Sequence, residues 1–336
     1  MTSATDRLIT RTADGPIDGP HQTLVSIVLP AHNEEAALPL VVAAILDATF
    51  GHNVELIVLD DGSTDGTWAQ IERLANGHPG VRGLRFTRNF GHQAAILAGL
   101  LSARGDAVIV MDADGQHPPA LIPVLLERWR EGYPVVQAVR TAASERGLKG
   151  FFSRTFYRVL HALSGVDVPA GSADFRLLSR PVVDTVLRSA GHLLFLRGLV
   201  PYLGYDTAYI PFTAPPRIAG HTSYTWRKMA RLSIDGLLSF SVVPLRAAIA
   251  VGVTVSLASF LYLVYIVVIW LTASGVVPGW ASTVGLLSLL GGIQLLTLGV
   301  VGEYLGRLFL SSLNRPTFVI REETRSAVER AQSKTP

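Results

Sequence analysis

Two carboxylates that follow directly on an apolar run could hold a divalent cation. Residues 108–111 are Val, Ile, Val and Met, and Asp112 and Asp114 come next with Ala113 between them. A short continuous apolar run is typical of a strand buried inside a parallel sheet. In open α/β sheets ligands bind beyond the carboxyl ends of the strands, and Mg²⁺ or Mn²⁺ prefers carboxylate oxygens and shares its shell with phosphates. The alternative is a solvated Asp-Gly turn, which this motif by itself leaves open.

Polar clusters also follow two other apolar runs. Residues 30–35 read Pro-Ala-His-Asn-Glu-Glu, and residues 60–67 read Asp-Asp-Gly-Ser-Thr-Asp-Gly-Thr. Taken singly, each cluster could be no more than a helix cap or a capping turn. Three such clusters at one edge of a sheet favour a binding or catalytic site.

Short β-rich runs alternate with helical stretches over residues 24–212, which predicts a parallel sheet with right-handed crossovers. The expected strands are 24–29, 54–59, 81–86, 107–111 and 135–139, and the expected helices are 34–48, 67–77, 92–103 and 120–131. No GxGxxG turn follows the first strand and no GxxxxGK[ST] motif occurs. Their absence argues against a dinucleotide-dependent oxidoreductase and against a P-loop NTPase.

The overall composition indicates membrane segments. The chain has 336 residues, of which 49% are hydrophobic, and its mean hydropathy of +0.36 is too apolar for an ordinary soluble protein. It contains no cysteine, so disulfides and thiolate metal sites are excluded. The formal net charge is only +3, and we expect no nucleic-acid partner.

Residues 247–302 contain no Asp, Glu, Lys or Arg. A helix over residues 247–271 would be about 37 Å long, enough to cross a hydrocarbon core of about 30 Å. Residues 283–302 would form a second span after a loop with helix-breaking Gly and Pro. The alternative is a buried hairpin in a large soluble core. Arg and Lys flank the two spans but not the loop between them, so both ends are expected on the cytoplasmic side.

These features predict a multi-pass protein of the cytoplasmic (inner) membrane with its catalytic domain in the cytoplasm. Basic amphipathic helices are expected at the membrane surface over residues 145–164 and 223–240. The expected parts are a flexible tail at 1–20, a catalytic domain at 21–215, a juxtamembrane loop and amphipathic helix at 216–246, the two membrane helices within 247–302, and a cytoplasmic segment at 303–336.

A set of motifs between Ser26 and Pro316 resembles glycosyltransferase family 2, in particular its polyprenyl-phosphate glycosyltransferases, which include bactoprenol glucosyltransferases and dolichol-phosphate mannose synthases. The motifs are 30–34 (Pro-Ala-His-Asn-Glu), 60–67, 88–92 (Arg-Asn-Phe-Gly-His), 112–118 (Asp-Ala-Asp-Gly-Gln-His-Pro), 174–176 (Asp-Phe-Arg), 216–220 and 302–307. The resemblance implies an α/β, Rossmann-like nucleotide-sugar-binding domain of the GT-A type. Interfacial amphipathic helices and a two-helix transmembrane hairpin would follow this domain.

The resemblance also implies roles for individual residues. The expected catalytic residues are Asp112, Asp114 and Asp174, and the expected metal ligands are Asp112, Asp114 and Gln116. The nucleotide sugar is expected to contact Pro30, His32, Asn33, Glu34, Asp61, Gly62, Asp112, Ala113 and Arg217. The acceptor phosphate is expected to contact Arg140, Lys149, Arg154 and Arg176. For Asp174 the alternative is an ion pair with Arg176, and for the basic residues it is a solvated face.

The implied function is inverting transfer of a sugar, by default glucose from UDP-glucose, to undecaprenyl phosphate or another polyprenyl phosphate, with Mg²⁺ or Mn²⁺ as cofactor. A phosphate monoester has a second pKa of about 6 and is already nucleophilic at neutral pH, so this acceptor needs no strong general base. The expected partners are the nucleotide sugar, the lipid, the membrane and, as a homo-oligomer, other copies of the chain. A processive polysaccharide synthase and a non-catalytic scaffold that binds nucleotide sugar are the alternatives.

The chain departs from the family at Ser223, where the family commonly has Lys. The resemblance implies that this loop closes over the diphosphate, so one cationic contact is missing. Arg217, His221 or Arg227 could replace it.

Overall fold

The computed structural model of the chain describes residues 23–141, 169, 171–189, 196–218, 243–272, 279–313 and 315–324. The chain divides into two compact units, which are Met1–His161 with Val166–Tyr224 and Pro316–Pro336, and Ala162–Gly165 with Thr225–Arg315. The two predicted surface helices, together with Lys149, Arg154 and Ser223, lie outside the described residues.

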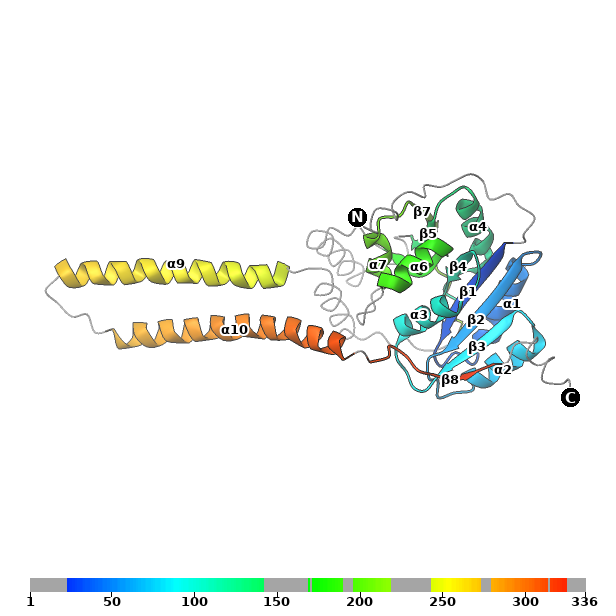
Figure 1. Ribbon diagram of the computed structural model, residues 1–336, viewed down its shortest axis with the longest axis horizontal. Coiled ribbons are helices and arrows are strands. Elements are labelled where there is room, and N and C mark those ends of the chain that lie inside the picture. The colour runs from blue at the N-terminus through cyan, green and yellow to red at the C-terminus, as the bar shows by residue number, and fades with distance from the viewer. Residues whose placement is uncertain are drawn as a thin grey trace, which may run out of the picture. The chain divides into compact units, whose positions relative to one another are not determined.

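The first unit is built on a sheet whose strand order is β7-β5-β6-β4-β1-β2-β3-β8 in the described part of the chain (Figure 1). Its strands are β1 (Leu24–Ala31), β2 (Asn53–Asp60), β3 (Val81–Phe86), β4 (Ala107–Val110), β5 (Val135–Arg140), β6 (Ser172–Ser179), β7 (Thr207–Phe212) and β8 (Ile320–Glu323). The five predicted strands are therefore confirmed, with small differences at their ends, and three more are present among the described residues.

The prediction of a parallel sheet is correct only in part. The strands β4, β1, β2 and β3 run parallel to one another, and β5 runs parallel to β7. However, β6 lies antiparallel between β4 and β5, and β8 lies antiparallel beside β3. The sheet is therefore mixed. The sequence hid β6 because Asp174 and Arg176, both buried, interrupt its apolar pattern.

Helices cover both faces of this sheet (Figure 1). They are α1 (Leu38–Ala48), α2 (Thr67–Gly77), α3 (His92–Ser102), the 3₁₀ turn η1 (Pro119–Leu121), α4 (Ile122–Arg130), α6 (Arg180–Ser189) and α7 (Leu196–Tyr202). The side chains of α1, α2 and α4 pack in one apolar cluster, and those of α3, α6 and α7 pack in another. Alternate residues of β2 enter the two clusters, as expected for a strand that is buried on both faces.

The first helix begins later than predicted, at Leu38 instead of residue 34. The reason lies in the loop before it. The backbone N–H of Glu34 donates to the Thr67 hydroxyl at 2.9 Å, and that of Glu35 donates to the Asp65 carboxylate at 3.3 Å. These bonds hold the end of β1 against the start of α2, so this part of the chain does not enter the helix.

The second unit contains two long helices, α9 (Val243–Thr272) and α10 (Trp280–Ser312), which contact each other. Two membrane spans were predicted, at 247–271 and 283–302. In the described part of the chain one helical segment, Leu289–Leu310, is long and apolar enough to cross a membrane, and none of it is buried. The apolar stretch of α9, Ala248–Tyr262, is shorter than Leu289–Leu310. These helices therefore do not support the prediction of a multi-pass protein.

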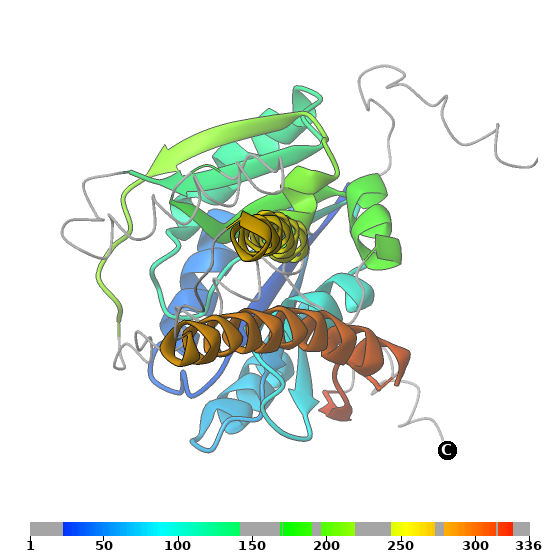
Figure 2. The ribbon, with the colours of Figure 1, turned by 90° about the vertical axis from the view of Figure 1, so that its left-hand side faces the viewer.

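The chain that follows α10 returns to the first unit. Its strand β8, red in Figures 1 and 2, lies beside the cyan strand β3 at the edge of the sheet, where Arg85 pairs with Glu322. The sequence assigned this region to a separate cytoplasmic segment. It did not predict the strand.

Candidate active site

The three polar clusters do meet at one edge of the sheet. Strand β1 lies between β2 and β4 and runs parallel to both. In this register Ala31 is paired with Asp60, and Val28 is paired with Val110. The loops after these strands are therefore neighbours, as the sequence predicted.

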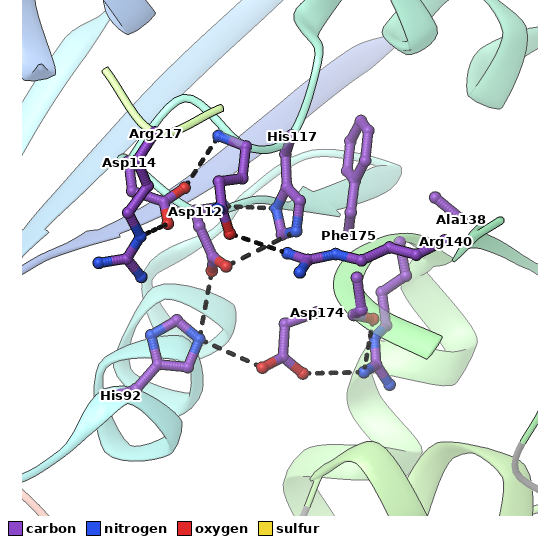
Figure 3. Close-up of polar contacts among 12 residues, drawn as sticks. His92, Asp112, Asp114, His117, Ala138, Arg140, Asp174, Phe175 and Arg217 are labelled. Atoms are coloured by element: carbon purple, nitrogen blue, oxygen red, sulfur yellow. Dashed lines mark hydrogen bonds and ion pairs between the residues drawn. The ribbon is translucent and has the colours of Figure 1, made fainter. Parts of the chain in front are cut away.

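The Asp112 carboxylate lies between two histidines (Figure 3). His92 Nε2 is 3.3 Å from Asp112 Oδ1, and His117 Nε2 is 3.6 Å from Asp112 Oδ2. His117 is fully buried, and its Nδ1 accepts a hydrogen bond from the Asp112 backbone N–H at 2.9 Å. Its ring stacks on Phe175 with centroids 5.1 Å apart. Burial lowers the pKa of His117, so the neutral ring carries its proton on Nε2, the nitrogen that faces the carboxylate.

The Asp114 carboxylate is held by its own turn and by the segment after β7. Its Oδ1 accepts the Gln116 backbone N–H at 2.9 Å, and its Oδ2 lies 3.1 Å from Arg217 Nε. The next residue, Ile218, donates its backbone N–H to the Asp114 carbonyl at 3.3 Å. A Cβ on Gly115, whose φ is +81°, would meet the Ile218 side chain at 2.5 Å. Residues 217 and 218 therefore cover the turn that carries both aspartates.

The side chains of this turn fit a hard divalent cation. Asp112 Oδ1 is buried and accepts no hydrogen bond from any described residue, although His92 Nε2 lies 3.3 Å from it. Burial raises the pKa of Glu34 to about 7, and the neighbouring Asp114 adds to this rise. Among the described residues no group of three or more His, Asp or Glu side chains is arranged to hold a metal. The remaining ligands would therefore come from Gln116 or from the phosphates of a substrate.

Asp174 on β6 is the centre of a second cluster, and it is 1% exposed. Its carboxylate accepts hydrogen bonds from Arg197 Nη2 at 2.7 Å, from Arg176 Nη2 at 3.0 Å and from Gln93 Nε2 at 3.1 Å. His92 Nε2 lies 3.2 Å from the same carboxylate. Burial alone would raise the pKa of Asp174, but Arg197, His92 and Arg176 outweigh it and hold the pKa well below its ordinary value. Asp174 is therefore an ionised anchor whose oxygens are already engaged, which does not suit a general base.

His92 connects the two clusters because its Nε2 contacts both Asp112 and Asp174 (Figure 3). Burial opposes its positive charge, but the two carboxylates raise the pKa of His92 to about 8. The ring is therefore mostly cationic at neutral pH. Neither His92 nor Arg197 was among the predicted site residues. The motif at 88–92 was the available signal for His92, whereas nothing near Arg197 in the sequence marks it.

The residues predicted to bind the nucleotide join the first two polar clusters. Asn33 has a left-handed φ of 57°, and its side-chain oxygen accepts the Thr64 backbone N–H at 2.8 Å. His32 Nδ1 donates to the Asp61 carbonyl at 2.9 Å. Pro30 is the second-last residue of strand β1, directly before this loop. The contacts fix the loops to each other, and a role of these side chains toward a nucleotide stays a prediction.

The Asp61 carboxylate is buried and supports the loop before α3. It accepts the backbone N–H groups of Phe90 at 2.7 Å and Gly91 at 3.0 Å. Burial raises the pKa of Asp61, and these two hydrogen bonds oppose that rise. The next residue, Gly62, has a φ of +64°, and a Cβ there would overlap the backbone of residues 88 and 89. The turn at 61–62 and the loop at 88–91 are therefore packed directly on each other.

Two predicted acceptor-phosphate residues are described by the structure. Arg140, at the end of β5, is half-buried and donates from Nη2 to Gln116 Oε1 at 3.3 Å, which places it beside the acidic turn at 112–116. Arg176 is buried and forms an ion pair with Asp174. This ion pair was the alternative that the sequence analysis gave for Asp174. A contact of either arginine with a phosphate stays a prediction.

Comparison with known proteins gives a consistent picture. The sequence pattern of the family described as Glycosyl transferase family 2 matches residues 26–187. An uncharacterized glycosyltransferase of Bacillus subtilis is 38% identical, over 88% of this chain and 93% of its own length. The bactoprenol glucosyl transferase of Shigella phage SfV is 36% identical, over 89% of this chain and 98% of its own length.

A solved structure also matches part of the chain. It is glucosyl-3-phosphoglycerate synthase from Mycobacterium tuberculosis in complex with Mn²⁺, uridine diphosphate and phosphoglyceric acid. The match has a TM-score of 0.47 and 25% identity, and it covers 65% of this chain and 78% of that chain. At this TM-score the ligands of that enzyme have no bearing on this site.

Proposed function

The chain belongs to glycosyltransferase family 2, and on this basis we propose that it transfers a sugar from a nucleotide diphosphate sugar to the phosphate of a polyprenyl lipid. Relatives that match nearly their whole length are named bactoprenol glucosyl transferases. We therefore propose glucose as the sugar, UDP-glucose as the donor and undecaprenyl phosphate as the acceptor.

The main observation behind this proposal is that an arginine cluster lies directly beside an acidic turn. His92 Nε2 lies 3.3 Å from Asp112 and 3.2 Å from Asp174, so the two groups are neighbours. The single negative charge of Asp174 faces the guanidinium groups of Arg176 and Arg197. Two guanidinium groups therefore gather around one carboxylate beside the acidic turn, which suits an anionic acceptor. The carboxylates of the turn suit the donor diphosphate through a cation.

The chemistry needs positioning more than proton transfer. The acceptor phosphate, with a second pKa of about 6, can attack the anomeric carbon without a base. A bound Mg²⁺ or Mn²⁺ would neutralise charge on the leaving diphosphate. Asp112, Asp114 and Gln116 would hold that ion. Asp174 would fix the arginines, and Arg197 and Arg140 would hold and screen the acceptor phosphate as the bond forms on the face opposite the leaving group.

We also propose that this reaction takes place at the cytoplasmic face of a membrane, with α9 and α10 inserted as a hairpin. Large apolar side chains on both helices are exposed, among them Val253, Phe260, Leu287, Leu295 and Leu296. Soluble proteins rarely leave so much apolar surface in water, whereas a lipid bilayer covers it. The charge-free interval at 247–302 supports the same proposal.

Purified protein supplied with Mg²⁺ or Mn²⁺, radiolabelled UDP-glucose and undecaprenyl phosphate is expected to yield a labelled lipid that is extracted into organic solvent. A panel of other nucleotide sugars tests the choice of donor. If no nucleotide sugar gives a lipid-linked product, the proposed function is wrong. A long polymeric product would instead indicate a processive synthase. Calorimetric binding of UDP without any transfer would indicate a scaffold.

Replacing Arg197 tests the acceptor side. Arg197 is 27% exposed and is held by Asp174 through Nε and Nη2. Arg197→Gln is expected to raise KM for undecaprenyl phosphate about 10- to 100-fold, because it removes charge-assisted hydrogen bonds to the phosphate. KM for the nucleotide sugar should change little. Arg188→Gln, an exposed arginine on α6, is the matched control. An equal rise in both KM values would contradict this assignment.

A further inference from the structure

Strand β8 follows the helix α10 in sequence. It nevertheless supports the side of the site at which the nucleotide is proposed to bind. Thr324 donates its backbone N–H to the Gly83 carbonyl at 2.9 Å, and its hydroxyl accepts the Gly83 N–H at 2.8 Å. At the other end of the strand, the Thr87 N–H donates to the Val319 carbonyl at 3.0 Å. The pairing therefore extends from Gly83 to Thr87, up to the loop at 88–91.

An aromatic path leads from this segment to the loop. Phe318 stacks on Phe86 with centroids 5.3 Å apart and planes 13° apart. Phe86 in turn meets Phe90 edge-on, with centroids 5.7 Å apart. The backbone N–H of Phe90 is one of the two groups that bind the Asp61 carboxylate. Phe318 thus supports Phe90 through Phe86, and Phe90 joins the loop at 88–91 to the turn after β2.

A charged path runs beside the aromatic one. Glu322 Oε1 lies 3.6 Å from Arg85 Nη1, and Arg85 Nε lies 3.4 Å from Asp60 Oδ2. Asp60 is fully buried, and its Oδ1 accepts the Ser63 backbone N–H at 2.8 Å, which shapes the turn after β2. Asp60 Oδ2 accepts no hydrogen bond from a described residue, so the arginine is the group that compensates its charge there. Glu322 is 40% exposed, so its contribution is smaller than that of the aromatic stack.

The charged path ends on the turn that carries the predicted nucleotide contacts Asp61 and Gly62, and the aromatic path ends on the loop packed against that turn. The turn at 60–63 holds Asp61 and Gly62, and its contact with residues 88 and 89 leaves no room for a Cβ at position 62. The loop at 88–91 leads directly into His92, which contacts Asp112 and Asp174. A shift of this loop would therefore displace the turn at 60–63, which carries predicted nucleotide contacts, together with His92.

We propose that residues 316–324 are a positioning element for nucleotide binding, with Phe318 as the principal residue and Glu322 as a secondary one. The element holds the loops at 60–63 and 88–91 in the arrangement that accepts the nucleotide. This inference rests on the proposed function for the identity of the ligand, a uridine diphosphate group. The catalytic unit is thus completed by chain that lies beyond both long helices in the sequence.

The test uses the full-length protein and measures the Kd for UDP in the presence of Mn²⁺ by calorimetry. Phe318→Ala is expected to raise this Kd about 3- to 10-fold, the range that the loss of one aromatic pair implies. Amide exchange at residues 88–92 should accelerate, while KM for the lipid acceptor should stay nearly constant. Phe318→Tyr should restore the wild-type Kd. Val319→Ala, an exposed neighbour in the same segment, is the matched control.

A double-mutant cycle separates positioning from a general loss of stability. If Phe318 acts through Phe90, then Phe318→Ala should have little further effect on the Kd in a Phe90→Ala background. A merely structural role would lower the melting temperature and the active fraction without changing the Kd of the folded protein. Glu322→Gln should raise the Kd by about twofold or less, compared with Glu323→Gln, an exposed residue of the same strand, as control.

Two outcomes distinguish this inference from the proposed function. If the wild-type protein binds no UDP, the proposed function fails and this inference fails with it. If the wild-type protein binds UDP, and Phe318→Ala binds it equally well with unchanged exchange at 88–92, the positioning role alone is overturned.

Discussion

Asp112→Asn is expected to lower the rate of sugar transfer at least about 100-fold, with little change in folding. The substitution keeps the shape of the side chain but removes the charge that a divalent cation needs next to the diphosphate. Asp112 Oδ1 accepts no hydrogen bond from a described residue. The amide removes the ion pair of this oxygen with His92, which keeps its contact with Asp174. The measurement is the initial rate of lipid-linked product formation at saturating donor and acceptor.

A second readout tests the metal assignment independently of activity. For the wild-type protein, Mn²⁺ should tighten UDP binding in calorimetry, whereas for Asp112→Asn this gain should largely disappear. Asp47→Asn, which removes an exposed aspartate of α1, is the matched control and should behave as wild type. Near-normal transfer by Asp112→Asn would remove this residue from the metal site.

Asp174→Asn is expected to damage both stability and activity. The amide would leave the buried guanidinium of Arg176 without its carboxylate, and such a loss costs about 3–5 kcal/mol of the free energy of unfolding. Arg197 and His92 would lose their common anchor, so transfer should fall steeply as well. Chemical denaturation gives the stability, and the transfer assay gives the rate.

The double variant Asp174→Asn with Arg176→Met separates these two effects. It removes the buried guanidinium whose charge Asp174 compensates, so most of the stability should return. Transfer should stay low because Arg197 and His92 still lack the Asp174 carboxylate. Asp184→Asn, on the exposed face of α6, serves as control. Recovery of transfer together with stability would mean that Asp174 is only a structural residue.

The pH dependence of stability gives a further check on Asp174. Its folded pKa lies well below the ordinary value of about 3.9, so its contribution to stability is fully present above that pH. The contribution is lost only as the pH falls further, through the folded pKa. The Asp174 carboxylate itself therefore adds no pH dependence across the neutral range. The part of the difference between wild type and Asp174→Asn that comes from His92, whose pKa is raised to about 8, should instead shrink as the pH rises through that value.

Local patterns were sufficient to predict β4, which leads into the acidic turn, and several other elements of the first unit. Strand β3 and helix α2 occupy the predicted residues, and β4 ends one residue before its predicted end. Such segments are recognisable because apolar residues repeat with the period of a strand or a helix over a short window. The turn at 112–116 was predicted from the same kind of signal, since the two aspartates directly follow a buried apolar run.

Segments that depend on distant partners were not predicted. Strand β8 has the sequence Ile-Arg-Glu-Glu, which has no alternating apolar pattern, and it forms only because the edge of β3 offers free backbone groups. Strand β6 contains Asp174 and Arg176, whose burial is tolerated because each compensates the charge of the other. Neither feature can be recognised without knowing which strands are neighbours.

The sequence by itself determined which acids stand at the ends of buried strands, because the order of residues along a strand and the turn after it are local properties. Only the tertiary structure decided that His92 and Arg197 surround Asp174, since α3 and α7 bring them to β6 from distant parts of the chain. The physical reason is that the charge and hydrogen bonding of a buried group depend on its neighbours in space. Those neighbours are set by strand order and helix packing, which act over distances that a local pattern does not record.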